Sequence, residues 1–420
     1  MATENFLVEL GTEELPPTAL KKLSDAFTAG VEAGLTDSGI SFGDVTSYAA
    51  PRRLAITIEA LQTEQEDKEE TLYGPPAKIA FDADGQPTKA AEGFASRAGA
   101  TAADLQTAPD SHGKNAGKLM IQRTIKGKQT SELLGDIVQN SLDKLPIPKR
   151  MRWGASRVEF VRPVQWLVML LGNTVVDAEV LGLKAGNTSR GHRFHAPGEV
   201  TIAEPLAYQE TLRGAYVMTS FAERSALIKE QVTAEGKKLG GEAIIDDDLL
   251  DEVTALNEWP VALAGSFDED FLRVPPEALV SSMKEHQKYF HVMKDGKLLP
   301  NFITVSNIES KDPAQVISGN EKVIRPRLAD AAFFWDTDRK QKLESRFEKL
   351  ENVVWVNKLG SIADKARRIS ALATRIAGET GGDAALVQRA AQLCKNDLVS
   401  QMVFEFTDLQ GLAGKYYAEH

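Results

Sequence analysis

The sequence predicts a multidomain α+β protein, with an N-terminal α/β and strand-rich part up to about residue 325 and an all-α part after it. Up to that point, short alternating or continuous apolar runs are separated by glycine and proline, which is typical of strands and turns. Beyond it, long segments place apolar residues at helical spacing and contain almost no proline. The 420 residues are enough for about two to four domains, each with its own core.

Composition restricts the class of protein. A hydrophobic fraction of 42% and a charged fraction of 26% are ordinary for a globular chain. The net charge of −11 argues against a uniformly basic nucleic-acid-binding protein, although a local basic patch can still act within an acidic whole. The single cysteine excludes a disulfide framework and a cysteine-rich zinc site, and it favours a cytoplasmic setting. No apolar run approaches the ~20 residues that span a bilayer, and the N-terminus lacks a basic leader.

The first elements follow from local patterns. Phe6–Leu10 is a short apolar run that predicts a buried strand, and Pro16 and Pro17 then favour the first turn of a helix. Apolar residues at helical spacing continue that helix to Val31. Residues 45–48 and the alternating residues 54–58 predict two further strands.

A polar, turn-rich stretch at residues 60–75 predicts a domain boundary. After it we expect short helices at 89–98 and 101–106, a strand at 119–125 and a helix at 130–143. Prolines at 146 and 148 end that helix, because proline disfavours helical geometry in the residue before it.

The middle of the chain is predicted to be rich in strands and the last part to be helical. Gly319 and Asn320 favour a turn, and Arg325, Pro326 and Arg327 favour extended chain before the helical part begins. The predicted strands are 164–171, 175–180, 200–202 and 299–305, and the predicted helices are 222–239, 247–257, 327–350, 358–379 and 384–403.

Familiar catalytic signatures are absent from the sequence. It contains no GxxxxGK[ST] phosphate loop, no HExxH zinc helix and no GxSxG nucleophile elbow. Cys394 lies at helical spacing among leucines, so we expect a small buried hydrophobic residue there. The residues alone give no candidate catalytic group.

Residues 188–195 combine two histidines with two arginines. His192 and His195 have a spacing that could serve a metal, but no third ligand is near and Arg190 and Arg193 would repel a cation. Guanidinium groups suit anions, so a contact with phosphate or RNA is one interpretation of this segment. A purely structural loop is the other.

Two basic clusters stand out against the acidic whole. The first, between Lys144 and Val168, includes Lys149, Arg150 and Arg152 and is interleaved with Trp153 and Trp166. Cations neutralise backbone phosphates and indole rings stack on exposed bases, so this pattern predicts RNA contact. The alternative is a solvated charged face with tryptophans in the core. The second cluster contains Lys322, Arg325 and Arg327, which could equally bind phosphate or the carboxylates of another domain.

Long strings of this sequence resemble the β subunit of bacterial heterotetrameric glycyl-tRNA synthetase. The resemblance runs from end to end and is carried by residues 6–17, 50–54, 145–149, 151–154, 190–194, 287–290, 299–303, 317–327 and 403–411. It implies a tRNA-binding, non-catalytic subunit, required with an α subunit for the ATP-dependent attachment of glycine to tRNA(Gly) in an α2β2 heterotetramer. ATP and magnesium are then expected at the active site of the α subunit, and no cofactor, metal or membrane on this chain.

The resemblance also implies a division into domains. We expect an N-terminal α+β segment (1–65), an α/β segment (66–150), a strand-rich domain similar to the editing module of phenylalanyl-tRNA synthetase β subunits (151–325), and an all-α, degenerate HD-type domain (326–420). Members of the family continue into an anticodon-binding domain, so this chain resembles a C-terminally truncated form. HD hydrolases need histidine and aspartate ligands, and Lys395 stands where a histidine is expected, which argues against metal-dependent hydrolysis.

Two other functions remain as alternatives. One is an autonomous hydrolase, either an HD-type phosphohydrolase or an aminoacyl-tRNA deacylase, and the other is a scaffold that holds α subunits without touching RNA. Under the leading hypothesis the residues predicted to contact tRNA are Lys149, Arg150, Arg152, Arg190, His192, Arg193, Lys322, Arg325 and Arg327.

Overall fold

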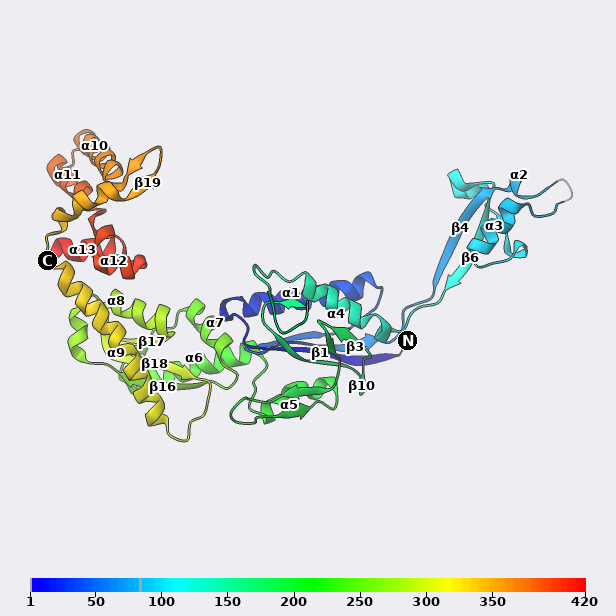
Figure 1. Ribbon diagram of the computed structural model, residues 1–420, viewed down its shortest axis with the longest axis horizontal. Helices are drawn as coiled ribbons and strands as arrows, with labels where there is room; N and C mark the ends of the chain where they lie inside the picture. The colour runs from blue at the N-terminus through cyan, green and yellow to red at the C-terminus, as the bar shows by residue number, and fades with distance from the viewer. Residues whose placement is uncertain (1, 83–84) are drawn as a thin grey trace.

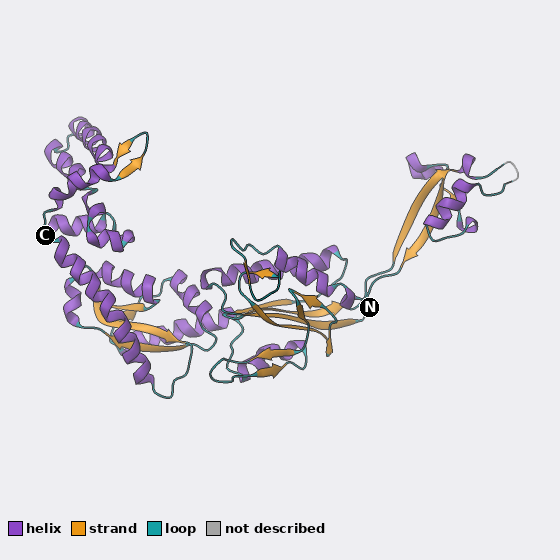
Figure 2. Cartoon of the chain, viewed as in Figure 1, coloured by secondary structure: helices purple, strands orange, loops and turns teal. Residues whose placement is uncertain are grey.

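The computed structural model describes residues 2–82 and 85–420 as a row of units (Figure 1). A central unit (residues 2–63 and 130–217) lies in the middle, and an arm (64–129) projects from one end of it. On the other side follow a second sheet unit (218–338) and then a helical unit (339–420). The coarse prediction of a multidomain α+β protein is confirmed by this mixture of small antiparallel sheets and helices (Figure 2).

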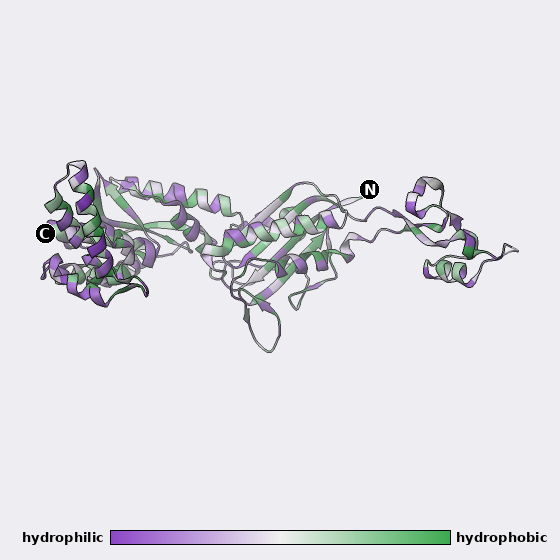
Figure 3. Ribbon diagram, turned by 90° about the horizontal axis from the view of Figure 1, so that it is seen from above, coloured by the Kyte–Doolittle hydropathy of each residue, from purple (hydrophilic) through white to green (hydrophobic). Residues whose placement is uncertain are grey.

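A five-stranded antiparallel sheet forms the centre, in the order β10-β9-β1-β3-β2. Its middle strand, β1, is buried on both faces over most of its length, and the sheet is correspondingly hydrophobic (Figure 3). In the register, Glu9 lies opposite Ala55 on one side and Val168 on the other. The strands are β1 (Thr3–Thr12), β2 (Val45–Ala50), β3 (Arg53–Gln62), β9 (Val164–Leu171) and β10 (Thr174–Val175).

The two faces of the central sheet carry different helices (Figure 1). Phe6, Val8 and Leu10 belong to the core under α1 (Leu20–Asp37) and α4 (Leu134–Asp143). Strand residues alternate between faces, so Leu7 joins the opposite core with residues of α5 (Tyr208–Gly214). Glu9 has the same parity as Leu7 and therefore points to the α5 side, where the site described below is built.

The predicted domain boundaries at residues 65 and 150 do not divide this unit. Strand β9 pairs with β1, although about 150 residues separate them, and α4 packs beside α1 in the same core. The predicted strand 175–180 is also two short strands, β10 and β11, that pair with different partners. Pairing between distant strands leaves no signal in a short stretch of sequence. The periodicity of each segment therefore predicts a strand but not the strand with which it pairs.

The arm leaves the central unit after β3 and returns before α4. Its two connecting segments run side by side, with Gln65 N donating to Lys128 O at 2.9 Å and Thr130 N donating to Thr63 O at 2.8 Å. The arm contains a three-stranded sheet and a small apolar core. Its elements are β4 (Lys68–Pro76), α2 (Ala77–Ala80), α3 (Lys89–Arg97), β5 (Gln106–Thr107) and β6 (Lys118–Ile125).

Three short hairpins belong to the central unit, and the second sheet unit follows them in the chain. That unit is a four-stranded antiparallel sheet in the order β15-β17-β18-β16, covered by α6 to α9. The hairpins are β7 (Met151–Arg152) with β8 (Glu159–Phe160), β11 (Glu179–Val180) with β12 (Leu183–Lys184), and β13 (Thr188–Arg190) with β14 (Glu199–Thr201). The larger elements are α6 (Phe221–Lys238), β15 (Glu242–Ala243), α7 (Asp247–Leu256), β16 (Val261–Ser266), α8 (Pro276–Ser281), β17 (Phe290–Lys294), β18 (Lys297–Ser306) and α9 (Pro313–Asp338).

The turn and extended segment predicted at residues 319–327 are wrong. Helix α9 runs through them without a break and contains Pro326 in its interior. Pro326 is exposed, so the carbonyl that loses its helical hydrogen bond can be hydrated, while Ile324 and Leu328 on either side are buried in the core. Burial of this apolar face outweighs the local preference of proline. The helix also crosses the predicted boundary at 325/326.

The helical unit departs from the prediction in several further places. The predicted helix 327–350 is divided, since α9 ends at Asp338 and a 3-10 helix begins at Leu343, and two short strands lie in the part predicted to be all-α. The predicted helix 384–403 ends at Leu393, because Asn396 and Asp397 are buried and bond to backbone groups elsewhere. Cys394, predicted to be buried, is exposed. The unit consists of the 3-10 helix η8 (Leu343–Asn352), β19 (Val354–Val356), β20 (Gly360–Ser361), α10 (Ile362–Thr380), α11 (Ala384–Leu393), α12 (Gln401–Glu405) and α13 (Leu412–Glu419).

Candidate functional site

A buried ionic network lies on the α5 side of the central sheet. Glu9 of β1, Arg53 of β3 and Glu258, just after α7, are almost completely inaccessible to solvent. Arg53 contacts Glu9 at 3.4 Å and Glu258 at 3.2 Å, and Arg52 contacts the second oxygen of Glu258 at 3.0 Å. Two carboxylates and two guanidiniums therefore compensate one another inside the protein.

Hydrogen bonds satisfy the rest of the Glu9 carboxylate. It accepts from the hydroxyls of Ser189 and Tyr208 and from the indole N–H of Trp166. Burial raises the pKa of Tyr208, and the neighbouring Glu9 raises it further, so the phenol remains a donor. The indole ring lies directly over Gly11, where an added Cβ would fall 1.9 Å from Trp166 Cε2. Glu9 and Gly11 together fix the orientation of Trp166.

Charge pairing keeps the network ionised. Burial alone would raise the pKa of Glu258, but the adjacent Arg53 and Arg52 outweigh that effect and the pKa is lowered. Burial likewise acts to lower the pKa of Arg53, whereas Glu9 and Glu258 raise it above its ordinary value. A buried pair of this kind survives only while both partners are present.

The two arginines also hold the segment that carries Arg190 and Arg193. Arg53 donates to Ser189 Oγ at 3.1 Å and to the Arg190 carbonyl at 2.9 Å. Arg52 donates to the Gly191 carbonyl at 3.0 Å. The backbone from Ser189 to Gly191 is thus positioned by buried guanidiniums rather than by its own turn chemistry.

A small pocket of about 190 Å³ opens where this segment meets the ends of β1 and β9. Arg190 reaches over the Trp166 ring, 5.4 Å from its centroid, and has no carboxylate partner among the residues that the structure describes. The hydroxyl of Thr12 lines the same pocket, is buried and finds no hydrogen-bond partner within the described ranges. Arg193 is held at the mouth by Glu13 at 3.2 Å and Glu14 at 3.6 Å. A guanidinium and a hydroxyl are chemically suited to a phosphate.

His192 supports this segment from beneath and is only 1% exposed. Its Nε2 lies 2.8 Å from the Asn307 carbonyl, and its Nδ1 accepts from the backbone N–H groups of Phe194 and His195, both at 3.2 Å. Both ring nitrogens are engaged, so the structure gives His192 a positioning role between the central and second sheet units. Within residues 2–82 and 85–420, no three His, Cys, Asp or Glu side chains gather as a metal site.

The predicted residues Lys149, Arg150 and Arg152 lie after α4, away from the network in sequence. Arg150 donates to the carbonyl of Asp143 at 2.7 Å and to that of Leu142 at 3.4 Å, at the carboxyl end of α4. Arg152 pairs with Glu159 across the β7–β8 hairpin. Lys149 is exposed, and the described part of the chain offers it no ion-pair partner. The side chains of Arg150 and Arg152 are therefore already engaged in contacts that stabilise the fold.

The predicted residues Lys322, Arg325 and Arg327 are exposed on α9. Successive helical residues are about 100° apart, so Lys322 and Arg325 share one side while Arg327 lies about 200° further around the axis. None of the three has an ion-pair or hydrogen-bond partner for its side chain in the part of the chain that the structure describes. Their charges are directed to solvent rather than to internal contacts.

Comparison with known proteins identifies the family. Residues 6–420 match the family model described as glycyl-tRNA synthetase beta subunit. The chain belongs to this family. It is 58% identical to a glycine–tRNA ligase beta subunit of Marinobacter nauticus, 55% to one of Stutzerimonas stutzeri and 56% to one of Ectopseudomonas mendocina. Each match covers 100% of this chain, which spans about 60% of the length of these relatives.

Within this beta subunit fold, the nine predicted residues fall in three places. Only Arg190 and Arg193 line the pocket, and His192 supports the same segment from beneath. The residues that the sequence interpretation missed are Glu9, Arg52, Arg53 and Glu258, which build the site. Two local signals point to them: a glutamate within the apolar run Phe6–Leu10, and adjacent arginines directly before a strand. Among the described helices, none has both the length and the apolar character needed to cross a bilayer.

The environment of His192 in the beta subunit fold predicts a pH dependence. Burial lowers the pKa of His192 below its ordinary value, and protonation at Nδ1 would displace two backbone donors. Unfolded histidine takes up a proton near pH ~6.5, so the unfolded chain binds more protons there than the folded chain. We expect the free energy of unfolding to fall as the pH drops through ~6.5 and then to level off below the folded pKa.

Thermal unfolding of the wild type and His192→Gln at pH 5, 6, 7 and 8 measures this effect. Each unit by which the pKa lies below normal contributes about 1.4 kcal/mol of pH-dependent stability. His291, whose pKa burial also lowers, provides a residual slope in both proteins. An equal slope for wild type and His192→Gln would contradict the prediction.

Proposed function

We propose that this chain is the tRNA-binding, non-catalytic part of a glycine–tRNA ligase beta subunit, acting in the cytoplasm. In this proposal it works with an alpha subunit, in an α2β2 assembly, in the ATP-dependent attachment of glycine to tRNA(Gly). ATP and magnesium then belong to the alpha subunit. The names of its relatives, which are beta subunits, support the existence of that partner.

The observation that carries the RNA-binding part is a set of exposed cations without partners in the described part of the chain. Arg190 stacks on Trp166, and α9 carries the exposed residues Lys322, Arg325 and Arg327. The net charge of the whole chain is −11. Cations of this kind on an acidic protein offer local attraction to a phosphate backbone without the need to break an ion pair. Arg150, Arg152 and Arg193, in contrast, would have to give up existing contacts.

We further propose that the second half of the chain resembles an editing-type module followed by a degenerate HD-type domain. The contacts of Asp397 support the proposal that the HD-type domain is degenerate. Its Oδ2 accepts from the backbone N–H groups of Gly411 and Gly414. Asn396 likewise bonds to the Leu343 carbonyl. Side chains that bond to backbone groups in this way hold the helices together, and they are not available to bind a metal ion for hydrolysis.

Charge reversal on α9 tests the RNA-binding proposal. We expect Lys322→Glu/Arg325→Glu to weaken binding of a tRNA(Gly) transcript at least ~10-fold at 0.1 M salt. The slope of log affinity against log salt should also shrink by about one for each phosphate that the variant no longer neutralises. Fluorescence anisotropy at several salt concentrations measures both quantities.

The matched control is Lys229→Glu/Lys237→Glu, which changes the net charge equally at two exposed positions of α6 that have no ion-pair partner within the described residues. It should lower affinity much less, because only a general charge effect remains. Co-purification of both variants with the alpha subunit checks that the partner surface is intact. Equal affinity and equal salt slope for the wild type and the α9 variant, with alpha binding retained, would favour a scaffold that does not touch RNA.

A further inference from the structure

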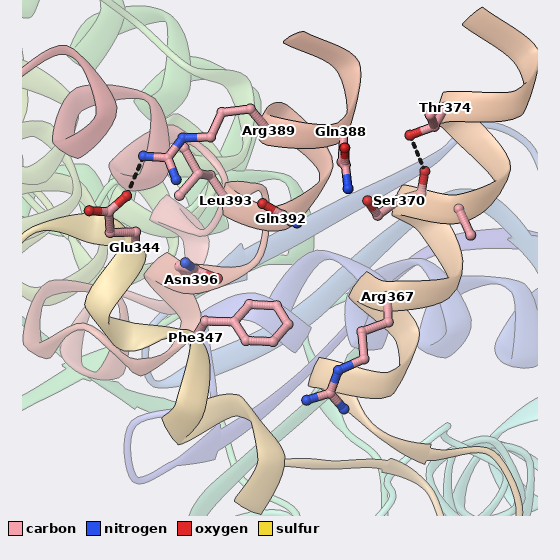
Figure 4. A pocket seen from close by; sticks show the side chains of 11 residues that line it. Glu344, Phe347, Arg367, Ser370, Thr374, Gln388, Arg389, Gln392, Leu393 and Asn396 are labelled. Atoms are coloured by element: carbon pink, nitrogen blue, oxygen red, sulfur yellow. Dashed lines mark hydrogen bonds and ion pairs between the residues drawn. The ribbon is translucent and has the colours of Figure 1, made fainter. Parts of the chain in front are cut away.

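An unassigned cavity of the helical unit lies among η8, α10 and α11 (Figure 4). Its volume is about 570 Å³, which exceeds what a few waters need and falls within the size range of small-ligand sites. It is separate from the network around Glu9 and contains none of the residues predicted from the sequence to contact tRNA.

One wall of this cavity offers an aromatic face. The Phe347 ring of η8 points into the space between α10 and α11 (Figure 4). Ala371 of α10 and Leu393 of α11 also line the cavity and add apolar surface. The Arg367 guanidinium lies over this ring, 5.5 Å from its centroid, in a cation–π contact. An aromatic ring is a common stacking platform for a flat heterocycle.

The opposite wall offers neutral hydrogen-bonding groups. Gln388 and Gln392 extend from α11 toward the cavity, and their side-chain amides have no partner among the described residues. Asn396 lines the cavity at its base and is fully buried. Its Nδ2 donates to the Leu343 carbonyl at 3.0 Å, whereas its Oδ1 accepts no hydrogen bond from any residue that the structure describes. A buried acceptor without a donor costs free energy unless a ligand supplies an N–H group.

The charged groups at the rim restrict the choice of ligand. Arg367 pairs with Asp364 at 3.0 Å and with Glu351, and Arg389 pairs with Glu344. Three carboxylates surround two guanidiniums, so the rim has no surplus of positive charge. A di- or triphosphate would be repelled by this arrangement, whereas a neutral ring bearing amino and carbonyl groups would not.

We propose that this cavity binds an unstacked nucleobase. The base stacks on Phe347, an exocyclic or ring N–H donates to Asn396 Oδ1, and the amides of Gln388 and Gln392 contact its remaining edge. The base belongs either to an unpaired nucleotide of an RNA or to a free nucleoside. The proposal that the base comes from an RNA rests on the proposed function of the chain, whereas binding of a free nucleoside does not depend on it.

Saturation-transfer NMR on the full chain tests the proposal with adenosine, cytidine, guanosine and uridine, and with a single-stranded RNA tetranucleotide. We expect saturation of base protons to exceed that of ribose protons for at least one of these probes. The variant Gln388→Ala/Gln392→Ala should weaken binding at least ~5-fold, and Phe347→Ala at least ~10-fold. The matched control, Gln341→Ala/Gln401→Ala, removes two exposed amides outside the cavity and should bind as the wild type does.

The probes distinguish the two sources. Binding of a nucleoside and the tetranucleotide with similar affinity supports a free nucleoside, and binding of the tetranucleotide alone supports RNA. No binding of any probe, or binding that the cavity variants leave unchanged, overturns the proposal. The Lys322→Glu/Arg325→Glu variant separates this result from the proposed function: it should retain binding at the cavity while losing affinity for tRNA. Failure of the cavity proposal would therefore leave the test of tRNA binding on α9 intact.

Discussion

Replacement of Glu258 by alanine is expected to lower the free energy of unfolding by about 3–5 kcal/mol, because it leaves the buried Arg52 guanidinium without a carboxylate and Arg53 with Glu9 alone. Arg52 and Arg53 would both lose the partner that they share. The backbone of Glu258 also accepts from Met218 N and donates to Asn307 Oδ1, so the side-chain contacts that the substitution removes lie at the junction between the central and second sheet units. Urea denaturation followed by tryptophan fluorescence, with Trp166 in the network, measures the loss.

Two further variants serve as comparisons for the stability loss of Glu258→Ala. Glu13→Ala removes the carboxylate from a half-exposed pair with Arg193 and should cost no more than about 1 kcal/mol. Glu258→Gln keeps a hydrogen-bonding oxygen but not the charge, so it should fall between the two. If Glu258→Ala and Glu13→Ala had the same urea midpoint, the network would contribute nothing specific to stability.

Replacement of Asp338 by alanine should have a comparable effect on the helical unit. Asp338 is buried at the end of α9 and accepts from Arg346 at 2.8 Å, from the backbone N–H groups of Gln401 and Met402, and from the Tyr417 hydroxyl at 2.9 Å. One carboxylate at the end of α9 therefore connects three segments of the helical unit, namely η8, α12 and α13. Its removal leaves Arg346 buried without a counter-charge, and we expect a loss of about 3–5 kcal/mol.

The effect of Asp338→Ala should be confined to one part of the chain. Trp335 stacks on Tyr417, with ring centroids 5.3 Å apart, so near-UV circular dichroism reports on this unit. Limited proteolysis should cut after residue 340 while the central unit persists. Asp383→Ala, which removes only the cap of α11, is the control and should cost about 1 kcal/mol. Equal midpoints for Asp338→Ala and Asp383→Ala would contradict the role of Asp338 as a shared acceptor.

Local periodicity predicted individual elements well but not their partners. The helices α1, α4 and α6 lie close to where apolar spacing placed them, since each needs only one buried face. The pairing of β1 with β9 depends on which edge strand completes the sheet, and no short window contains that information. Pro326 shows the opposite limit, because there the local preference was clear and tertiary burial of α9 overrode it.

The candidate site was predictable only in its exposed half. Arginines and histidines within one short segment indicated an anion-binding loop around Arg190, and the structure places that loop at a pocket. The groups that position the loop were not predictable, because Arg53 and Glu258 lie 205 residues apart in sequence. A glutamate in a strand can face solvent or an internal cation, and only the register of β1 decides between them.

The way in which the arm is attached has a consequence for the history of the fold. The chain departs from Thr63 and comes back at Thr130, and those two residues are directly hydrogen-bonded. The entire excursion between them thus begins and ends at one point on the parent body. Such an insertion can be lengthened, exchanged or deleted without redirecting the path of the polypeptide through the sheet. The arm can therefore change in evolution independently of the central unit that carries it.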